Sequence, residues 1–174
     1  MSVVVAVRIN KNVYMGADGA VSSEDYTAQL AAPKVFKKGI VTFGCAGSLR
    51  CAQVIKHGPL PRPPAYREDS AHYVVNAIVP FLRQRFRECD APADDFEGLV
   101  ALRSRIFEIT PKTFSVIEIK EEYAATGSGY LLALGSLAST TKMVDAERRV
   151  LRALVATARH CPSVSEPFYV TRVR

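Results

Sequence analysis

The chain has 174 residues, of which 48% are hydrophobic and 23% charged. This length and balance suit a single domain over residues 1–174 with a layered core, and they argue against a second domain. The net charge is +6, but the basic residues are scattered rather than interleaved with aromatic residues. That pattern favours a solvated helix face or a subunit interface and argues against a nucleic-acid groove.

No stretch of the sequence approaches the ~18 consecutive apolar residues of a membrane span. The opening MSVVVAV has neither a basic leader nor a cleavage site, so we expect a cytoplasmic protein with no membrane partner. We predict no metal and no organic cofactor. Reduced, mostly buried thiols are expected instead, because no zinc-ligand spacing joins the four cysteines, Cys45, Cys51, Cys89 and Cys161.

Two hairpins are predicted near the start of the chain. The β-rich runs 2–9 and 13–18 are joined by the tight connection 10–12. A second hairpin is expected over 34–44, with Gly39 supplying its turn.

Two helices separated by a connector come next. The first is predicted from about Ser48 to His57, and the proline-rich segment 58–66 must be a connector because proline fixes φ and removes backbone donors. Asp69 or Ser70 caps the second helix, and Pro80 is expected to kink it. Its apolar face is read from residues at three- and four-residue spacing, namely Tyr73, Val74, Ala77, Ile78, Phe81, Leu82 and Phe86.

The second half of the chain is predicted to contain several strands, then two helices and then a final strand. Strands are expected at 98–104, 105–110, 114–119, 123–129 and 168–173, and helices at 130–139 and from about 145 to 160. Two antiparallel sheets between two helix layers would bury every apolar face. We therefore predict an α+β fold, the four-layer αββα sandwich.

Ser2 is the first candidate for chemistry, because removal of Met1 would leave it as the first residue. A free α-amine titrates near ~7.7–8.0. It could therefore take the proton of the hydroxyl on the same residue, making nucleophile and general base one residue. Many cytosolic proteins begin Met-Ser without such a role, so Ser2 alone is weak evidence.

The run SVVVAVRINKNVYMGADGAV resembles the amino terminus of mature proteasome β subunits and of the bacterial HslV protease. In that family of N-terminal-nucleophile hydrolases a nucleophilic Thr opens the first strand and an Asp-Gly pair closes the second. Ser2 and Asp18 have the same sixteen-residue spacing, and Lys34 stands a further sixteen residues along, as the family lysine does. Taken singly, an Asp-Gly turn and a surface lysine are ordinary features.

Two glycine-containing motifs extend the resemblance. Gly44, in GCAGS, matches the glycine whose amide helps to form the oxyanion hole, and Ser128, in YAATGSG, matches the serine beside the nucleophile. The resemblance implies that Lys34 favours the unprotonated amine and the developing alkoxide, while Asp18 keeps that lysine charged. It also implies an apolar pocket for a hydrophobic substrate side chain, lined by Val21, Ala32, Phe36, Thr42 and Ala46.

The function that the resemblance implies is a peptidase built of homo-oligomeric stacked rings and acting on proteins or peptides, with an ATP-dependent unfoldase as partner. Two departures from the family pattern bear on it: Ser2 replaces Thr, and Cys161 stands about where the family has an Asp that supports the terminal amine. A thiol is mostly neutral at pH 7 and does not supply that charge. His160, beside it, is the kind of residue that complements a helix end.

Three alternatives stay open at this stage. The first is a catalytically inactive, proteasome-like subunit kept for assembly within a larger particle, for instance a viral one, and retention of Met1 would favour it. The second is an N-terminal-nucleophile amidase that acts on small molecules without a closed chamber. Nucleic-acid binding, which would weaken steeply with salt, is the least favoured.

Overall fold

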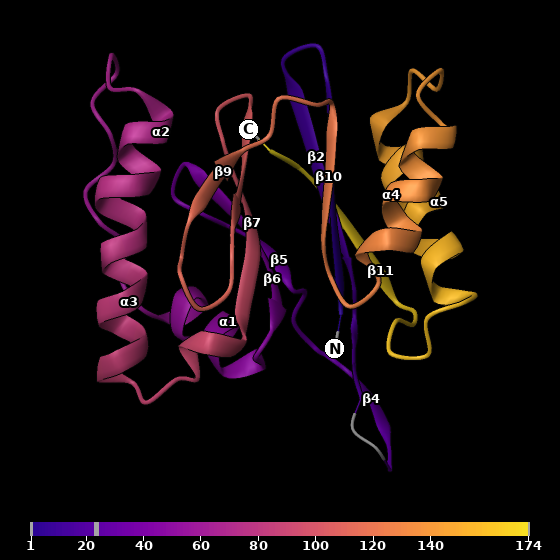
Figure 1. Ribbon diagram of the computed structural model, residues 1–174, viewed down its shortest axis with the longest axis horizontal. Coiled ribbons are helices and arrows are strands. Elements are labelled where there is room, and N and C mark those ends of the chain that lie inside the picture. Colours follow the sequence, from indigo (N-terminus) through magenta and orange to yellow (C-terminus); the bar gives the residue numbers. More distant parts are fainter. Residues whose placement is uncertain (1, 23–24, 174) are drawn as a thin grey trace.

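The computed structural model describes residues 2–22 and 25–173. Two β-sheets lie face to face, and a layer of helices covers the outer side of each (Figure 1). The strand order is β10-β1-β2-β11 in one sheet and β5-β6-β7-β8-β9 in the other, and all neighbouring strands are antiparallel. The predicted four-layer αββα arrangement is therefore confirmed.

The elements follow the predicted order closely. The strands are β1 (Val3–Ile9), β2 (Asn12–Asp18), β3 (Ala20–Ser22), β4 (Thr27–Gln29), β5 (Val35–Lys38), β6 (Val41–Gly47), β7 (Phe96–Leu102), β8 (Arg105–Ile109), β9 (Val116–Glu118), β10 (Tyr123–Gly127) and β11 (Phe168–Val173). The helices are α1 (Leu49–His57), α2 (Ser70–Tyr73), the π-helical turn η1 (Val74–Ile78), α3 (Val79–Glu88), the 3₁₀ turn η2 (Ala93–Asp95), α4 (Tyr130–Ser139) and α5 (Ala146–Ala158).

Strand β1 is buried on both faces, which explains its continuous apolar run VVVAV. Because side chains alternate along a strand, Val3 and Val5 pack against the layer of α4 and α5. Val4 and Ala6 face the other way, into the core between the two sheets. The first strand therefore joins two hydrophobic layers, and its start is held rigidly.

In the helical segment 70–88, individual residues determine where the helix begins and where it becomes irregular. Asp69 is its N-cap, and its side chain accepts a hydrogen bond from the His72 amide, which decides between the two predicted caps. Pro80 was expected to kink this helix. The irregularity takes the form of η1, directly before the proline, whose ring nitrogen has no hydrogen to donate to the preceding turn.

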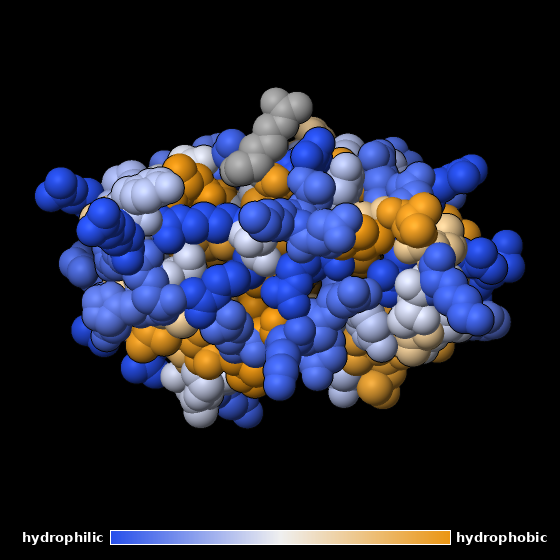
Figure 2. All heavy atoms as spheres, turned by 90° about the horizontal axis from the view of Figure 1, so that it is seen from above, coloured by the Kyte–Doolittle hydropathy of each residue, from blue (hydrophilic) through white to orange (hydrophobic). Residues whose placement is uncertain are grey.

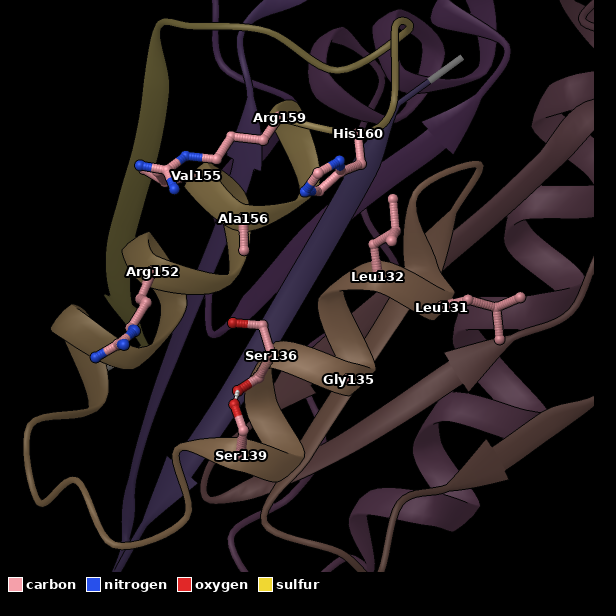
Figure 3. Close-up of a pocket in the computed structure, with 10 residues that line it drawn as sticks. All are labelled: Leu131, Leu132, Gly135, Ser136, Ser139, Arg152, Val155, Ala156, Arg159 and His160. Atoms are coloured by element: carbon pink, nitrogen blue, oxygen red, sulfur yellow. Dashed lines mark hydrogen bonds between the residues drawn. The ribbon is translucent and has the colours of Figure 1, made fainter.

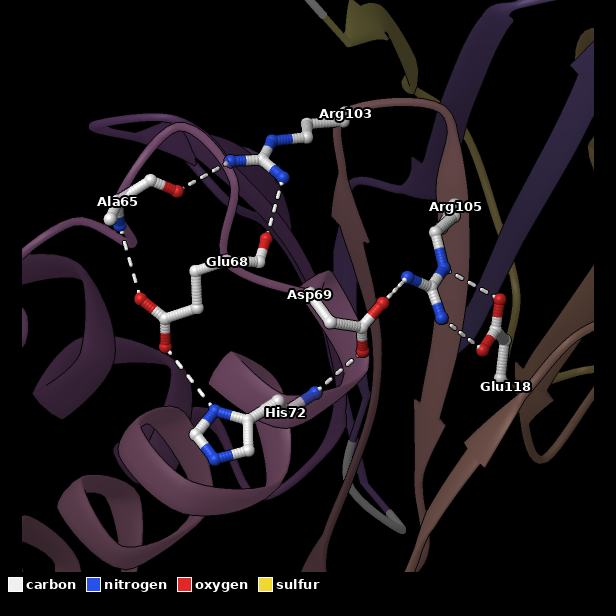
Figure 4. A network of polar contacts seen from close by, with 7 residues as sticks. All are labelled: Ala65, Glu68, Asp69, His72, Arg103, Arg105 and Glu118. Atoms are coloured by element: carbon white, nitrogen blue, oxygen red, sulfur yellow. Dashed lines mark hydrogen bonds and ion pairs between the residues drawn. The ribbon is translucent and has the colours of Figure 1, made fainter.

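The connector that leads into this helix is tied to the sheet by two arginines (Figure 4). Arg103 donates to the carbonyl of Glu68 at 2.9 Å. Arg105 lies 2.5 Å from the carboxylates of both Asp69 and Glu118, and these contacts hold the pKa of each carboxyl below its usual value. The outer helix layer is thereby fixed to β8 and β9.

The face seen from above is largely hydrophilic, with several separate groups of hydrophobic residues between the polar ones (Figure 2). Among the residues that the structure describes, no helix combines the length and apolar character needed to cross a membrane.

Candidate active site

The start of β1 opens onto a small cavity between the sheets and α1. Ser2 immediately precedes β1 and is 5% exposed. The cavity has a volume of about 50 Å³, and its lining comprises Ser2, Val21, Lys34, Cys45, Gly47, Ser48, Leu49 and Ala52. Two of the five predicted catalytic residues, Ser2 and Lys34, thus share one cavity.

Asp18 links the lysine to the first strand. One carboxylate oxygen, Oδ2, lies 2.6 Å from Lys34 Nζ, and the other, Oδ1, accepts a 2.9 Å hydrogen bond from the Val3 amide. Lys34 also donates to the carbonyl of Ala20. The Lys34 and Asp18 side chains are 4% and 0% exposed, so the pair is shielded from solvent.

The local sequence explains why these groups meet. Asp18 is the last residue of β2, which pairs with β1, and Lys34 directly precedes β5. Gly19 is required after Asp18, because a Cβ there would lie 2.7 Å from the carbonyl oxygen of Pro167 and 2.6 Å from the Tyr169 ring. The close passage of the chain past Pro167 and Tyr169 therefore depends on the absence of a side chain at Gly19.

Burial sets the electrostatics of the lysine. It lowers the pKa of Lys34, because desolvation penalises the charged ammonium, while the charge of Asp18 and its hydrogen bond act in the opposite direction. The thiol of Cys45 in the same cavity is affected in the other sense, because burial raises its pKa and keeps it protonated. Lys34, paired with Asp18, is therefore the basic group of the cavity, and Cys45 contributes an uncharged thiol to its wall.

Ser128 lies on the other side of Ser2. Its hydroxyl donates to the Ser2 carbonyl at 3.2 Å and lies 3.0 Å from the hydroxyl of Ser163. Ser163 in turn lies 3.3 Å from the thiol of Cys161. Sequence reasoning did not identify Ser163, and the serine and proline around it give no local signal, since its partner is 35 residues away.

Gly44 does not line the cavity. A Cβ at this position would lie 2.4 Å from Val4 Cγ1 and 3.0 Å from Met15 Cε, so its Cα faces the core between the sheets. Gly47, three residues on, lines the cavity instead and has φ +75°. A Cβ on Gly47 would lie 1.7 Å from the Asp95 carbonyl oxygen, so this position accepts only glycine.

Of the five predicted substrate-pocket residues, only Val21 lines the cavity. Ala32 is exposed, and Phe36 stacks on Phe43 in the helix-facing core, with ring centroids 6.1 Å apart. Thr42 and Ala46 lie on the face of β6 opposite to Cys45 and Gly47 because side chains alternate along a strand. That register places Cys45 opposite Lys34 and leaves Thr42 and Ala46 buried away from the cavity.

A larger hollow lies elsewhere in the molecule, between α4 and α5 (Figure 3). Its volume is about 600 Å³, and none of the predicted catalytic or substrate-binding residues lines it. Its walls carry exposed leucines from α4, Arg152 from α5, and Arg159 and His160 from the turn that follows α5. The candidate active site is therefore the small cavity at Ser2.

The layers, the strand order and the buried lysine at the start of β1 together define a class of fold. The chain has the proteasome-like fold of the N-terminal-nucleophile hydrolases. No protein-family model matches its sequence, and no curated protein matches it.

Solved structures are similar to this chain. BPH of Thiobacillus denitrificans in complex with epoxomicin superposes with a TM-score of 0.79 at 20% sequence identity, covering 98% of this chain and 97% of that chain. Another structure of BPH gives 0.77 at 19% identity, with coverage of 98% and 96%. HslV from Trypanosoma brucei gives 0.69 at 17% identity, with 98% of both chains covered. At these identities the likeness shows the fold alone.

Proposed function

We propose that this chain is the subunit of a proteasome-like peptidase in which Ser2, freed by removal of Met1, is the nucleophile. The observation that carries the proposal is the buried pair of Lys34 and Asp18, 2.6 Å apart, in the wall of the cavity that Ser2 also lines. A buried ammonium requires a compensating partner and a reason to be retained. Support of a nucleophile is such a reason.

The reaction would follow the chemistry of an N-terminal nucleophile. The Ser2 amine takes the hydroxyl proton as Oγ attacks the carbonyl carbon of the scissile bond, giving a tetrahedral oxyanion. The amine then returns this proton to the leaving nitrogen as the C–N bond breaks and an acyl ester forms. Water, activated by the same amine, adds to the ester, and the departing Oγ regains a proton. Lys34 stabilises the alkoxide that develops on Oγ.

We propose the Gly47 amide, rather than that of Gly44, as the donor to the oxyanion. The Cys45 amide donates to the Lys34 carbonyl at 3.0 Å, and amides two residues apart on a strand point to the same side. Strand β5 begins at Val35, so the Gly47 amide lies past the paired part of the hairpin, on the side of Ser2. A preorganised backbone donor at such a position is typically worth ~3–4 kcal/mol in the transition state.

The size and lining of the cavity support a proposal for the class of substrate. Its volume of about 50 Å³ and its apolar walls, Val21, Cys45, Leu49 and Ala52, fit a small aliphatic side chain next to the scissile bond. We therefore propose preferential cleavage after residues such as alanine or valine.

We extend the proposal to a single-domain subunit, residues 1–174, that assembles into homo-oligomeric rings and receives protein substrates from an ATP-dependent unfoldase in the cytoplasm. The support is the likeness of fold over 98% of the chain. Light scattering of the purified chain tests the assembly, because a monomeric mass would favour an open amidase of small molecules instead.

A second candidate is an assembly subunit without catalysis. A series of polar contacts runs from the Ser2 carbonyl through the Ser128 hydroxyl to the Ser163 hydroxyl and the Cys161 thiol. The series contains hydroxyl and thiol groups and no carboxylate. A site without a carboxylate there supports the terminal amine less strongly. This observation favours the non-catalytic alternative.

Epoxomicin labelling separates the two candidates. The solved BPH structure was obtained in complex with this compound, an epoxyketone that joins to an N-terminal hydroxyl and its amine. For the peptidase we expect a chain without Met1 that carries one adduct on Ser2, retained in Ser2→Thr and absent in Ser2→Ala. A chain that keeps Met1 and forms no adduct would exclude the peptidase and favour the assembly role.

A further inference from the structure

A hollow between α1 and α3, separate from the Ser2 cavity, gathers hydrogen-bond donors. Its volume is about 370 Å³, and its lining comprises Arg50, Gln53, Val54, His57, Gly58, Arg85 and Cys89. The four residues from α1 recur at three- and four-residue spacing, so they form one stripe of that helix. None of the lining side chains is a carboxylate.

Arg85 supplies the most specific observation. Its Nη1 lies 2.5 Å from Glu88 Oε2, whereas its Nε is fully buried and has no hydrogen-bond partner among the described residues. Gly58 packs against this edge of the guanidinium, since a Cβ there would lie 3.5 Å from Nε and 3.7 Å from Nη2. A buried donor without an acceptor is costly, and a bound acceptor would remove that cost.

The surroundings of the hollow favour an anion. Arg50 is held over it by a 3.0 Å hydrogen bond to the Cys89 carbonyl. The negative end of α1 is offset by Lys38, whose Nζ donates to the carbonyls of Ile55 and Lys56, each at 2.8 Å, and of Gly58. The carboxylate of Glu88, one turn after Arg85 on α3, is already paired with Arg85.

We propose that this hollow binds a small oxyanion of the phosphate class between the guanidinium groups of Arg50 and Arg85. The guanidinium groups of Arg50 and Arg85 present planar sets of N–H donors that match the oxygens of a tetrahedral anion. Gln53 and His57 add further donors at the rim. The site lies outside the Ser2 cavity and does not depend on peptidase activity.

Thermal unfolding of the whole protein tests the site, with inorganic phosphate compared with sodium chloride at equal ionic strength. A ligand that binds only the folded state raises Tm, and we expect a rise of ~2–6 °C at saturating phosphate. Arg50→Gln and Arg85→Gln should abolish most of the rise. Arg87→Gln, which removes an exposed charge from the same helix, should keep it, and so controls for the general salting effect of phosphate.

Equilibrium dialysis with labelled phosphate gives a direct measure that does not depend on stability. We expect about one phosphate per chain, with a Kd at least tenfold weaker in Arg50→Gln and in Gln53→Leu, which serve if Arg85→Gln fails to fold. Binding of acetate as tight as that of phosphate would overturn the phosphate assignment. A Tm rise that is equal in all the arginine variants, or the absence of bound phosphate, would overturn the site.

Discussion

Lys34 and Asp18 form an ion pair inside the protein, with Nζ 2.6 Å from Oδ2 and both side chains almost without solvent contact. Removing one partner of a buried pair leaves the other as an uncompensated charge. We expect Lys34→Met to lower the free energy of unfolding by ~3–5 kcal/mol and to abolish peptide hydrolysis. Urea denaturation measures the first effect and peptide turnover the second.

The exposed neighbour Lys37 provides the matched control for that substitution. Lys37→Met removes the same charge from β5, three residues along the chain, and should change stability by less than ~0.5 kcal/mol. If Lys34→Met lowered the free energy of unfolding no more than Lys37→Met does, the result would contradict the buried ion pair.

The lowered pKa of Lys34 has a consequence for stability at alkaline pH. Because burial places its folded pKa below the 10.5 of an exposed lysine, the unfolded chain binds more protons in the interval between the two values. The stability of the wild type relative to Lys34→Met should therefore rise as pH increases through that interval.

Unfolding free energies of the wild type and Lys34→Met, compared from neutral pH to about pH 10, measure this effect. Taking the difference removes the contributions of Cys45 and Tyr73, whose pKa values are raised by burial and which act with the opposite sign. A difference that is flat or falls with pH would show that Lys34 titrates normally.

Leu49 is the largest of the apolar side chains that line the Ser2 cavity. Leu49→Ala would enlarge a cavity of about 50 Å³ at the first residue of α1 without introducing strain in the helix. We expect kcat/KM for substrates with phenylalanine before the scissile bond to rise at least ~10-fold relative to valine substrates. Leu132→Ala, in the hollow between α4 and α5, should leave the ratio unchanged.

Gly47 and Gly39 both have positive φ, but their surroundings differ. A Cβ at Gly47 would meet the Asp95 carbonyl oxygen at 1.7 Å, whereas a Cβ at Gly39 would have nothing within 4 Å. Gly39→Ala should cost only the conformational ~1–2 kcal/mol, and Gly47→Ala several kcal/mol more, with loss of activity in any folded protein. Equal melting temperatures for the two variants would refute the close contact.

Much of the fold followed from local patterns. The apolar run of β1, the Gly39 turn and the helical spacing before Phe86 each predicted an element that the structure contains. The hairpin of β3 and β4 was not predicted, because strands of three residues carry no readable alternation. The spacing of apolar residues likewise did not predict that the irregularity before Pro80 would be a π-helical turn.

The candidate site, too, could be predicted only in part from the sequence. The family resemblance selected Ser2, Asp18 and Lys34 from the sequence. The packing of the two sheets brings the last two together, with Asp18 at the end of β2 and Lys34 directly before β5. The face of β6 that meets the cavity was decided by the tertiary structure. A shift of one residue exchanges the two faces of a strand, so Gly44 and Gly47 could be told apart only once the register was known.

The sequence by itself determined the periodicities, the turns and the positions of the charged residues, because these depend on backbone geometry over a few neighbouring residues. Only the tertiary structure decided which groups share a cavity. The contact of Ser128 with Ser163 and the unpaired Nε of Arg85 arise from packing between segments distant in the chain, and no local pattern encodes such distances.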